Sequence, residues 1–438
     1  MRSSVRVGAS HAWVLLALGL SACGGNDDAA GAPPRDAGVE ADASADAPVV
    51  EEGGVDAKTD AWMPFDEGGA GDAAPAVRVS SLALEQVWYL TRNTANDFLI
   101  DFRTTPPTVT CNGDVGSSDG FEGTGVFTEP STGDLIFYTD GRTVFNGSTN
   151  QMLENGSGLN GDASATEPAL IAPKFGTDGT GFYIFTNATN VNPPSSVSYS
   201  EIDLSQGPHG TVTNKNVLLA EGNPGEALDL LPHTNETDFW VLIYDGAGSI
   251  AAYLVDETGL HTTPVTSPTG LTGTVKRSSI NHSMDYDTLV LTQNYGGPDG
   301  AIGTATIDRA TGKVSLAEVI ATGDLGYHAS FSEDGRKLYY VRGTEGWSGA
   351  AYQYDLDSAT ETLLGGSALG AAKLAPDGKV YWAGVDKPYL AVVHQPDAAG
   401  TAAQFDEQGL FLEGCQAGFG VPNQTASYLE YLPPEPPK

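Results

Sequence analysis

Three histidines stand where an imidazole could do chemistry. His233, His282 and His328 each belong to a short apolar run that precedes a tight turn. Imidazole binds transition metals and serves as a general acid or base near neutral pH. Single hydrogen-bonded histidines at the rim of a fold would give the same pattern. Because the three lie far apart in the sequence, only a fold that closes into a ring would gather them around one channel.

Carboxylates flank the apolar runs of this kind. They are Glu167, Glu226, Asp229, Asp285 and Asp287. Such carboxylates, together with Asn and His, would suit calcium. However, the sequence has no Asp-x-Asp-x-Asp-Gly loop, and Asp residues in turns also accept hydrogen bonds from backbone amides. It has no Gly-x-Ser-x-Gly elbow before a helix and no phosphate-binding glycine loop. We therefore predict no catalytic set and no dedicated metal site. The candidate channel-lining binding residues are His233, His282, His328, Asp229 and Glu167.

The elements that would position these side chains are hairpins, and two of them are nearly the same. His328 to Val341 and Ala372 to Ala383 each contain an apolar strand, an Asp-Gly turn and a strand rich in Tyr, Trp and Val. Glycine adopts positive φ at low cost, so Asp-Gly closes a hairpin whose strands keep their twist. The turn glycines Gly335 and Gly378 lie 43 residues apart. This period is typical of a four-stranded propeller blade.

The same pattern recurs upstream, so the sequence predicts an all-β fold. Seven β-rich runs follow turns, and no helical period of ten or more residues appears after the N-terminal segment. We predict one seven-bladed β-propeller over 80–432, with six or eight blades as alternatives. A jelly roll or a pair of sandwiches would not give a period of two hairpins along the whole domain. The seven runs are Asn96–Phe102, Gly133–Tyr138, Gly179–Phe185, Thr237–Tyr244, Asp287–Leu291, and those following Gly335 and Gly378.

A propeller must also close its ring. We expect a C-terminal strand at Ser427–Leu432 to pair with the N-terminal region at Gln86–Leu90, which would remove a sheet edge. Cys111 follows the first apolar run and Cys415 precedes the C-terminal strand. In a secreted protein two such cysteines usually pair, and a Cys111–Cys415 disulfide would clamp the ring at its seam. Two buried free thiols are the alternative.

Several runs resemble a family of exported bacterial β-propeller proteins described as WD40-like. They include Gly133–Asn146, Gly210–Leu218, Leu374–Tyr381 and Gly418–Asn423, in the same order along most of 87–432. The resemblance implies the propeller fold and an extracytoplasmic location. The sequence departs from the family in having Phe145 where Trp is expected, and in carrying its own lipobox. No activity is implied by the resemblance.

The N-terminal segment is typical of an exported, lipid-anchored protein. Arg2 and Arg6 precede an apolar core that is too short to span a bilayer, so 1–22 is predicted as a signal peptide. Leu20-Ser-Ala-Cys23 resembles a bacterial lipobox, which implies cleavage before Cys23 and its acylation, palmitate included. An ordinary signal peptide with an incidental Cys is the alternative. The Ala, Asp, Gly and Pro of 23–79 predict a disordered acidic linker, and 433–438 is a Pro-rich tail.

Charge excludes some partners. The 438 residues carry a formal net charge of −35, from 56 acidic and 21 basic side chains, so nucleic acid and anionic lipid surfaces are not expected partners. We predict a monomeric, membrane-anchored module of the bacterial cell envelope, at the outer membrane or cell surface, that binds or scaffolds a protein or glycan. The alternative is a calcium-dependent lactonase-type hydrolase with its site in the channel, and a quinone-dependent dehydrogenase is a third reading. No cofactor is expected except the calcium of that alternative.

Overall fold

The described part of the chain is built almost wholly from β-strands. The computed structural model describes residues 86–92, 97–111, 118, 120–129, 132–188, 195–221, 225–245, 248–271, 277–293, 299–323, 325, 327–343 and 349–423. All of them belong to one compact unit, Ala73–Lys438. Within these ranges the one helix is the short 3-10 turn η2 (Gly400–Ala403), and no helix is long and apolar enough to cross a membrane. The prediction of an all-β fold is confirmed.

The strands follow one another in short antiparallel groups. Their bounds, in chain order, are β1 Val87–Leu90, β2 Phe98–Asp101, β3 Thr108–Cys111, β4 Thr124–Thr128, β5 Leu135–Thr139, β6 Thr143–Asn146, β7 Met152–Ser157, β8 Ala169–Pro173, β9 Gly181–Asn187, β10 Ser196–Asp203, β11 Thr211–Glu221, β12 Leu228–Pro232, β13 Phe239–Tyr244, β14 Ser249–Asp256, β15 Gly259–Leu260, β16 Val265–Pro268, β17 Ser278–His282, β18 Thr288–Gln293, β19 Gly300–Asp308, β20 Lys313–Val314, β21 Glu318–Gly323, β22 Ser330–Phe331, β23 Lys337–Arg342, β24 Gly349–Asp355, β25 Thr360–Leu374, β26 Val380–Gly384, β27 Tyr389–Val393, β28 Phe405–Phe411 and β29 Pro422–Asn423.

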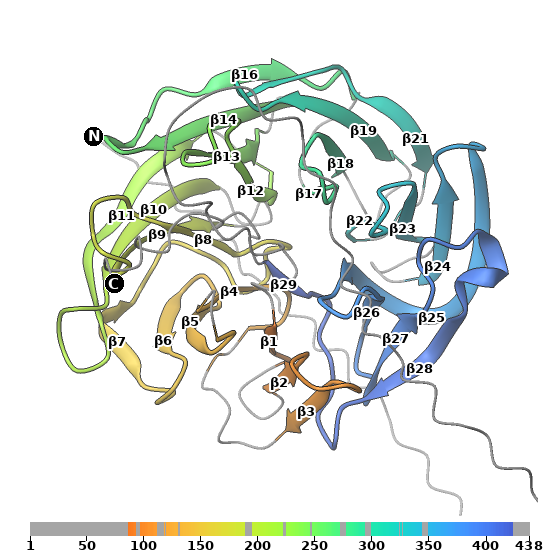
Figure 1. Ribbon diagram of the computed structural model, residues 1–438, viewed down its shortest axis with the longest axis horizontal. Coiled ribbons are helices and arrows are strands. Elements are labelled where there is room, and N and C mark those ends of the chain that lie inside the picture. The colour runs from red at the N-terminus through yellow and green to blue at the C-terminus, as the bar shows by residue number, and fades with distance from the viewer. Residues whose placement is uncertain are drawn as a thin grey trace, which may run out of the picture. The chain divides into compact units, whose positions relative to one another are not determined.

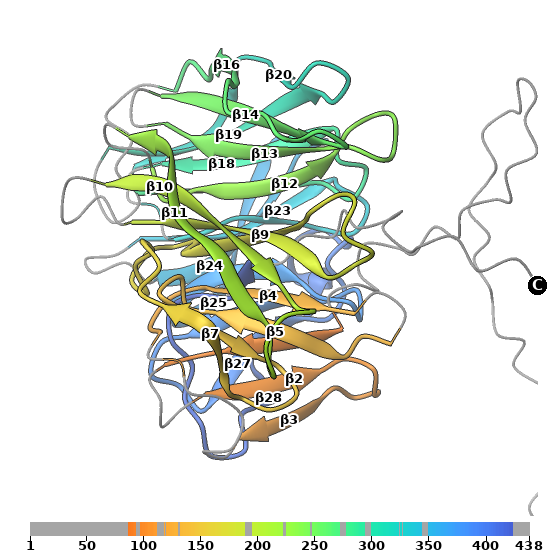
Figure 2. The ribbon, with the colours of Figure 1, turned by 90° about the vertical axis from the view of Figure 1, so that its left-hand side faces the viewer.

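These groups surround a centre, as a propeller requires. In Figure 1 the strands β4, β8, β12, β17 and β22 lie around the middle, and later strands of each group lie farther out. Figure 2 shows β9, β10 and β11 crossing the side of this ring. Each of the seven β-rich runs found in the sequence contains the second strand of a group: β2, β5, β9, β13, β18, β23 and β26. The propeller fold is therefore confirmed.

The sheet pairing does not by itself give the number of blades. The strands form sheets of three, nine, five, five and seven strands. One pair, Thr211 with Glu154, joins β11 to β7 and merges two groups into the nine-stranded sheet. The long strand β25 likewise pairs with β24 on one side and β26 on the other. The count of seven blades stays a prediction.

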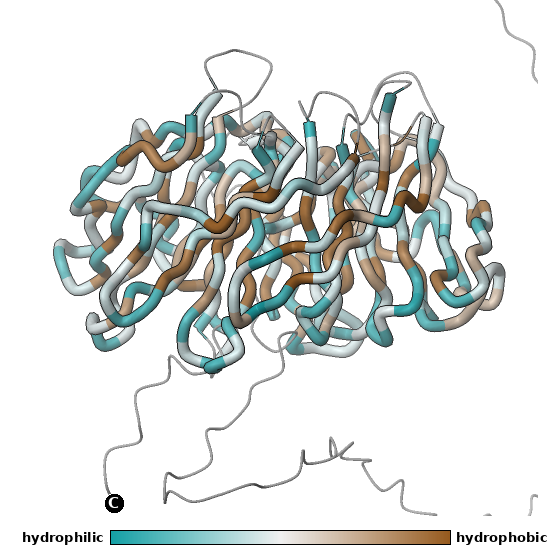
Figure 3. Tube along the Cα trace, turned by 90° about the horizontal axis from the view of Figure 1, so that it is seen from above, coloured by the Kyte–Doolittle hydropathy of each residue, from teal (hydrophilic) through white to brown (hydrophobic). Residues whose placement is uncertain are grey.

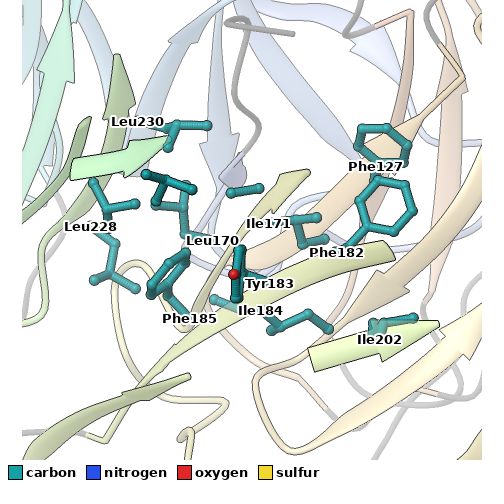
Figure 4. Close-up of a cluster of buried hydrophobic side chains, with 14 of the residues drawn as sticks. Phe127, Leu170, Ile171, Phe182, Tyr183, Ile184, Phe185, Ile202, Leu228 and Leu230 are labelled. Carbon is teal, nitrogen blue, oxygen red and sulfur yellow. The ribbon is translucent and has the colours of Figure 1, made fainter. Parts of the chain in front are cut away.

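The core lies between the faces of neighbouring sheets. Figure 3 shows hydrophobic residues along the middles of the strands and hydrophilic ones at many turns. The largest cluster joins three groups, with Phe127 and Phe182 in contact at 4.6 Å between ring centroids. Figure 4 shows Ile171 beside these rings, and Leu228 and Leu230 on the opposite side of the same cluster. Burial of such side chains stabilises by about 25 cal/mol per Å² of apolar surface, which holds each group against the next.

The C-terminal segment closes the ring between β25 and β4. The backbone N–H of Phe419 donates to Phe121 O, and Ala371 N–H donates to Phe419 O. Then β29 pairs in parallel with β4. This approach requires glycine, because a Cβ at Gly420 would lie 2.4 Å from the carbonyl carbon of Glu122. The strand that closes the ring within the described residues is thus β29. The run 427–432, which the sequence predicts to pair with Gln86–Leu90, lies outside the described residues, so that pairing stays a prediction.

A covalent bond lies at the same seam. Cys111 at the end of β3 is joined to Cys415 by a disulfide, with the two Cα atoms 5.6 Å apart and 304 positions between them in sequence. Cys415 is buried among Trp88, Leu390 and other residues of both chain ends. The bond thus links the first strand group to the residues that precede β29. The predicted lipidation site Cys23, the signal peptide 1–22 and the linker 23–79 lie outside the described residues.

Candidate functional site

An open cavity lies among the inner strands and gathers most of the candidate residues. It has a volume of about 720 Å³, counted out to its open mouth. Glu167, Asp229, His282 and His328 all line it, and they come from four successive strand groups. Glu167 precedes β8, Asp229 lies in β12, His282 ends β17 and His328 precedes β22. Ring closure therefore brings together four side chains that the sequence separates by about fifty residues each.

Asp229 and His282 form a hydrogen-bonded pair. The Nδ1 atom of His282 lies 2.9 Å and 3.1 Å from the two carboxylate oxygens of Asp229. Both side chains are largely buried, and Asp229 also accepts a hydrogen bond from Leu230 N–H at 2.8 Å. With Nδ1 bonded to the carboxylate, Nε2 is the nitrogen that is left to act as an acceptor or base. The carboxylate thus fixes the orientation of the imidazole.

Glu167 and His328 form a second, more deeply buried pair. His328 Nδ1 lies 2.8 Å from Ala372 O, so Nδ1 carries a proton and Nε2 lies toward Glu167 Oε1 at 3.4 Å. Burial, together with the charge of Lys373, lowers the pKa of His328 to about 4. Burial also raises the pKa of Glu167 well above its ordinary value, although Leu228 N–H donates to its other oxygen. Near neutral pH the imidazole is therefore uncharged, and burial favours the protonated form of the carboxyl group.

His233 does not belong to the cavity, so its prediction as a channel-lining residue is wrong. Its Nε2 lies 3.2 Å from Ala310 O, and its ring lies 6.0 Å from that of Trp240. The physical reason is register. The strand-ending hydrogen bond from His233 N–H to Asp238 O corresponds to the one from Ser332 N–H to Lys337 O. His233 therefore matches Ser332 at the turn, whereas Asp229, four positions earlier, matches His328.

The sequence reasoning missed several residues that line the cavity. Lys373 of β25 is one, and Asn423 of β29 is another, with its Nδ2 donating to Leu228 O at 3.1 Å. The repeat could have revealed Lys373. The turn glycines Gly335 and Gly378 are 43 positions apart, and the same offset makes Lys373 equivalent to Ser330, which also lines the cavity. Asn423 could not be found this way because β29 belongs to no repeat. Apolar side chains complete the lining: Ile280, Met284, Phe331, Leu374 and Val421.

A second buried polar cluster lies beside the seam. Glu122 accepts hydrogen bonds from Ser164 Oγ at 3.0 Å and from the hydroxyl of Tyr327. Glu226 accepts from both the N–H and the hydroxyl of Thr166, the residue before Glu167. Burial, together with the charge of Glu226, raises the pKa of Glu122 to about 9. The remaining flanking carboxylates, Asp285 and Asp287, lie exposed at a turn.

The side chains of the cavity do not form a metal centre. Among the described residues, no three His, Cys, Asp or Glu side chains lie close enough together to hold a metal ion. The other histidines with side-chain partners, His209 and His261, lie outside the cavity. His209 bonds to Thr149 and His261 to Thr258, and both pairs are exposed. The two His–carboxylate pairs supply too few oxygen donors for the set that calcium prefers.

No family model matches the chain, and no curated protein matches it. Among solved structures it is similar to a putative 6-phosphogluconolactonase from Bacteroides fragilis, with 11% identity, 76% of this chain and 96% of that one covered, and a TM-score of 0.46. It is also similar to TolB from Acinetobacter baumannii (17% identity, 63% and 62% covered, TM-score 0.33). A third is an oligogalacturonate lyase in complex with manganese (14%, 66% and 78%, TM-score 0.38). At these values the likenesses identify neither a family nor an activity.

Proposed function

We propose that this protein is a binding module of the bacterial cell envelope that recognises a glycan or a protein segment at its central cavity. The observation that carries the proposal is the convergence of Glu167, Asp229, His282 and His328 on one open cavity. Concave sites with a few fixed polar groups and an apolar lining are typical ligand sites. Hydrogen bonds hold these groups in place before a ligand arrives: His282 bonds to Asp229, His328 to Ala372 O, and Glu167 to Leu228 N–H. Such preorganisation lowers the entropy cost of binding.

The location is part of the proposal. A lipid-modified Cys23 would anchor the chain, and the acidic linker 23–79 would hold the propeller away from the bilayer. The measurement is membrane fractionation of cells that express the full chain. Cys23→Ser should move the protein into the soluble fraction, and Cys23→Ser that stays with the membrane would contradict the anchor. We further propose that the propeller is a monomer.

Binding at the cavity is tested with the full-length chain immobilised in detergent. Envelope material digested to soluble glycans and peptides is passed over it, and the retained molecules are identified by mass spectrometry. Asp229→Asn is the cavity variant, and His233→Ala is the matched control because His233 lies outside the cavity. Molecules retained by wild type and by the control, but not by the cavity variant, support the proposal. Material that all three retain equally would refute it.

A hydrolase that needs no metal is the second candidate, and one observation favours it. Asp229 fixes His282 through Nδ1, so that Nε2 could take a proton from water. Burial favours the protonated form of Glu167, which could donate its proton. The test is turnover of simple lactones and esters by wild type and His282→Gln. A rate that is equal for both, or equal to that of buffer, would exclude this candidate.

A further inference from the structure

We infer that the cavity takes the uncharged pyranose residue at the end of a glycan, with Asp229 and Lys373 contacting its hydroxyl groups. This inference rests on the proposed function and narrows its ligand from a glycan or protein segment to one chemical class. Three properties of the cavity carry it: its charge balance, the kinds of hydrogen-bonding group that it presents, and the apolar side chains between them.

The charges that line the cavity cancel, although the chain as a whole is strongly acidic. Formally Asp229 brings one negative charge and Lys373 one positive charge. Burial keeps His328 uncharged near neutral pH and favours the protonated form of Glu167. A ligand with a net charge would therefore enter a partly buried site that has no net charge to balance it, which is costly. An uncharged ligand meets no such penalty. A free peptide end, which carries an ammonium or a carboxylate, is disfavoured for this reason.

The polar groups include both donors and acceptors, which suits hydroxyl groups. Asp229 is an acceptor and the Lys373 ammonium is a donor, and a hydroxyl can donate to the first while accepting from the second. His282 adds a nitrogen whose role is set by its bond to Asp229. Sugars carry several hydroxyls close together, and most other uncharged metabolites do not. The cavity thus offers partners for more than one hydroxyl of the same ring.

Apolar side chains complete the site. Ile280, Met284, Phe331 and Val421 line the cavity beside the polar groups. A pyranose ring presents C–H groups on its faces, which can contact these side chains while its hydroxyls contact Asp229 and Lys373. Burial of that C–H surface adds about 25 cal/mol per Å². The mixture of fixed polar and apolar lining therefore matches a sugar better than a fully polar or a fully apolar ligand.

The test measures binding of six monosaccharides by saturation-transfer NMR and by calorimetry. The protein is the full-length chain in an amine-oxide detergent, because a detergent with sugar headgroups would compete. The uncharged probes are glucose, galactose, mannose and N-acetylglucosamine, and the charged ones are glucuronate and glucosamine. At least one uncharged sugar should bind at least about tenfold more tightly than both charged ones, a difference of about 1.4 kcal/mol. This comparison uses wild type alone, so it does not depend on how variants fold.

Variants then locate the binding. Asp229→Asn and Lys373→Met should each weaken the best sugar at least about tenfold, whereas His233→Ala should leave its affinity unchanged. The inference is overturned if no uncharged sugar binds, if a charged sugar binds as tightly, or if His233→Ala weakens binding as much as Asp229→Asn. If envelope peptides are captured through the cavity and sugars are not, this inference fails and the proposed function stands. If the cavity variants change neither sugar binding nor peptide capture, this inference and the proposed function both fail.

Discussion

Glu122→Gln should stabilise the protein, and the gain should grow with pH. Glu122 is 7% exposed and accepts hydrogen bonds from Ser164 and Tyr327. Its charged neighbours are Glu226, Asp162 and Arg277, and burial with Glu226 raises its pKa from 4.5 to about 9. A carboxyl whose pKa is higher in the folded state stabilises fully below pH 4.5 and loses that contribution as pH rises toward 9.

The magnitude follows from the shift. At pH 7 Glu122 is ionised in the unfolded chain and protonated in the folded one. The interval from its ordinary pKa of 4.5 to pH 7 is about 2.5 pH units, and each unit is worth about 1.36 kcal/mol. The free energy of unfolding is therefore lowered by about 3 kcal/mol. Glutamine does not titrate and keeps the shape, accepting from Tyr327 and donating to Ser164. Glu122→Gln should therefore raise the free energy of unfolding by up to about 3 kcal/mol at pH 7, by about 5 at pH 8.5 and by almost nothing at pH 4.5.

Urea unfolding followed by tryptophan fluorescence measures this, since Trp88 and Trp382 are fully buried. The control is Glu257→Gln, at an exposed turn, which should change stability by less than about 0.5 kcal/mol at every pH. A gain that is the same at pH 4.5 and 8.5 would show that ionisation of Glu122 is not its cause. A loss of stability at pH 8.5 would refute the reasoning outright.

Three further predictions concern the seam and the cavity. Replacing both Cys111 and Cys415 by Ala opens a loop of 304 positions and should cost about 5 kcal/mol, lowering Tm by roughly 8 °C, and dithiothreitol should then have no further effect. Between pH 6.5 and 4 the imidazole of His328 stays neutral in the folded protein but gains a proton in the unfolded chain, so the wild type loses stability as the pH falls. His328→Gln should make this loss about 3 kcal/mol smaller. Urea unfolding that gives parallel pH profiles for the two proteins would contradict this. Gly420→Ala should cost about 3 kcal/mol or more, since its Cβ would overlap the backbone of Glu122, whereas Gly343→Ala, in open space at φ 72°, should cost about 1; equal costs in thermal unfolding would refute the close approach.

The hairpins were predictable because their signals are local. The Asp-Gly turns at Gly335 and Gly378 have φ values of 71° and 72°, as their sequence requires. The strands that follow them carry buried aromatic residues such as Tyr339 and Trp382. Turn chemistry and β-propensity depend on only a few neighbouring residues, so turns and strands of this kind can be predicted from the sequence.

The site was only partly predictable because it depends on register across the ring. Asp229 and His328 occupy matching positions in two of the strand groups, and a comparison of whole hairpins is enough to find them. His233 was misplaced by four residues, since its apolar neighbours do not say where the strand ends. The pairing of β29 with β4 rests on close contact between glycines of distant segments, which no local pattern specifies.

The strand that completes the ring is also a wall of the cavity, and this has a thermodynamic consequence. Pro422 and Asn423 line the cavity while they pair with Thr124 and Gly125 of β4. A ligand that contacts them binds the closed ring and not an opened one, so occupancy and closure are linked. At a hundred times its Kd such a ligand would add about 2.7 kcal/mol against opening. By reciprocity, anything that loosens the seam must weaken the ligand by the same factor.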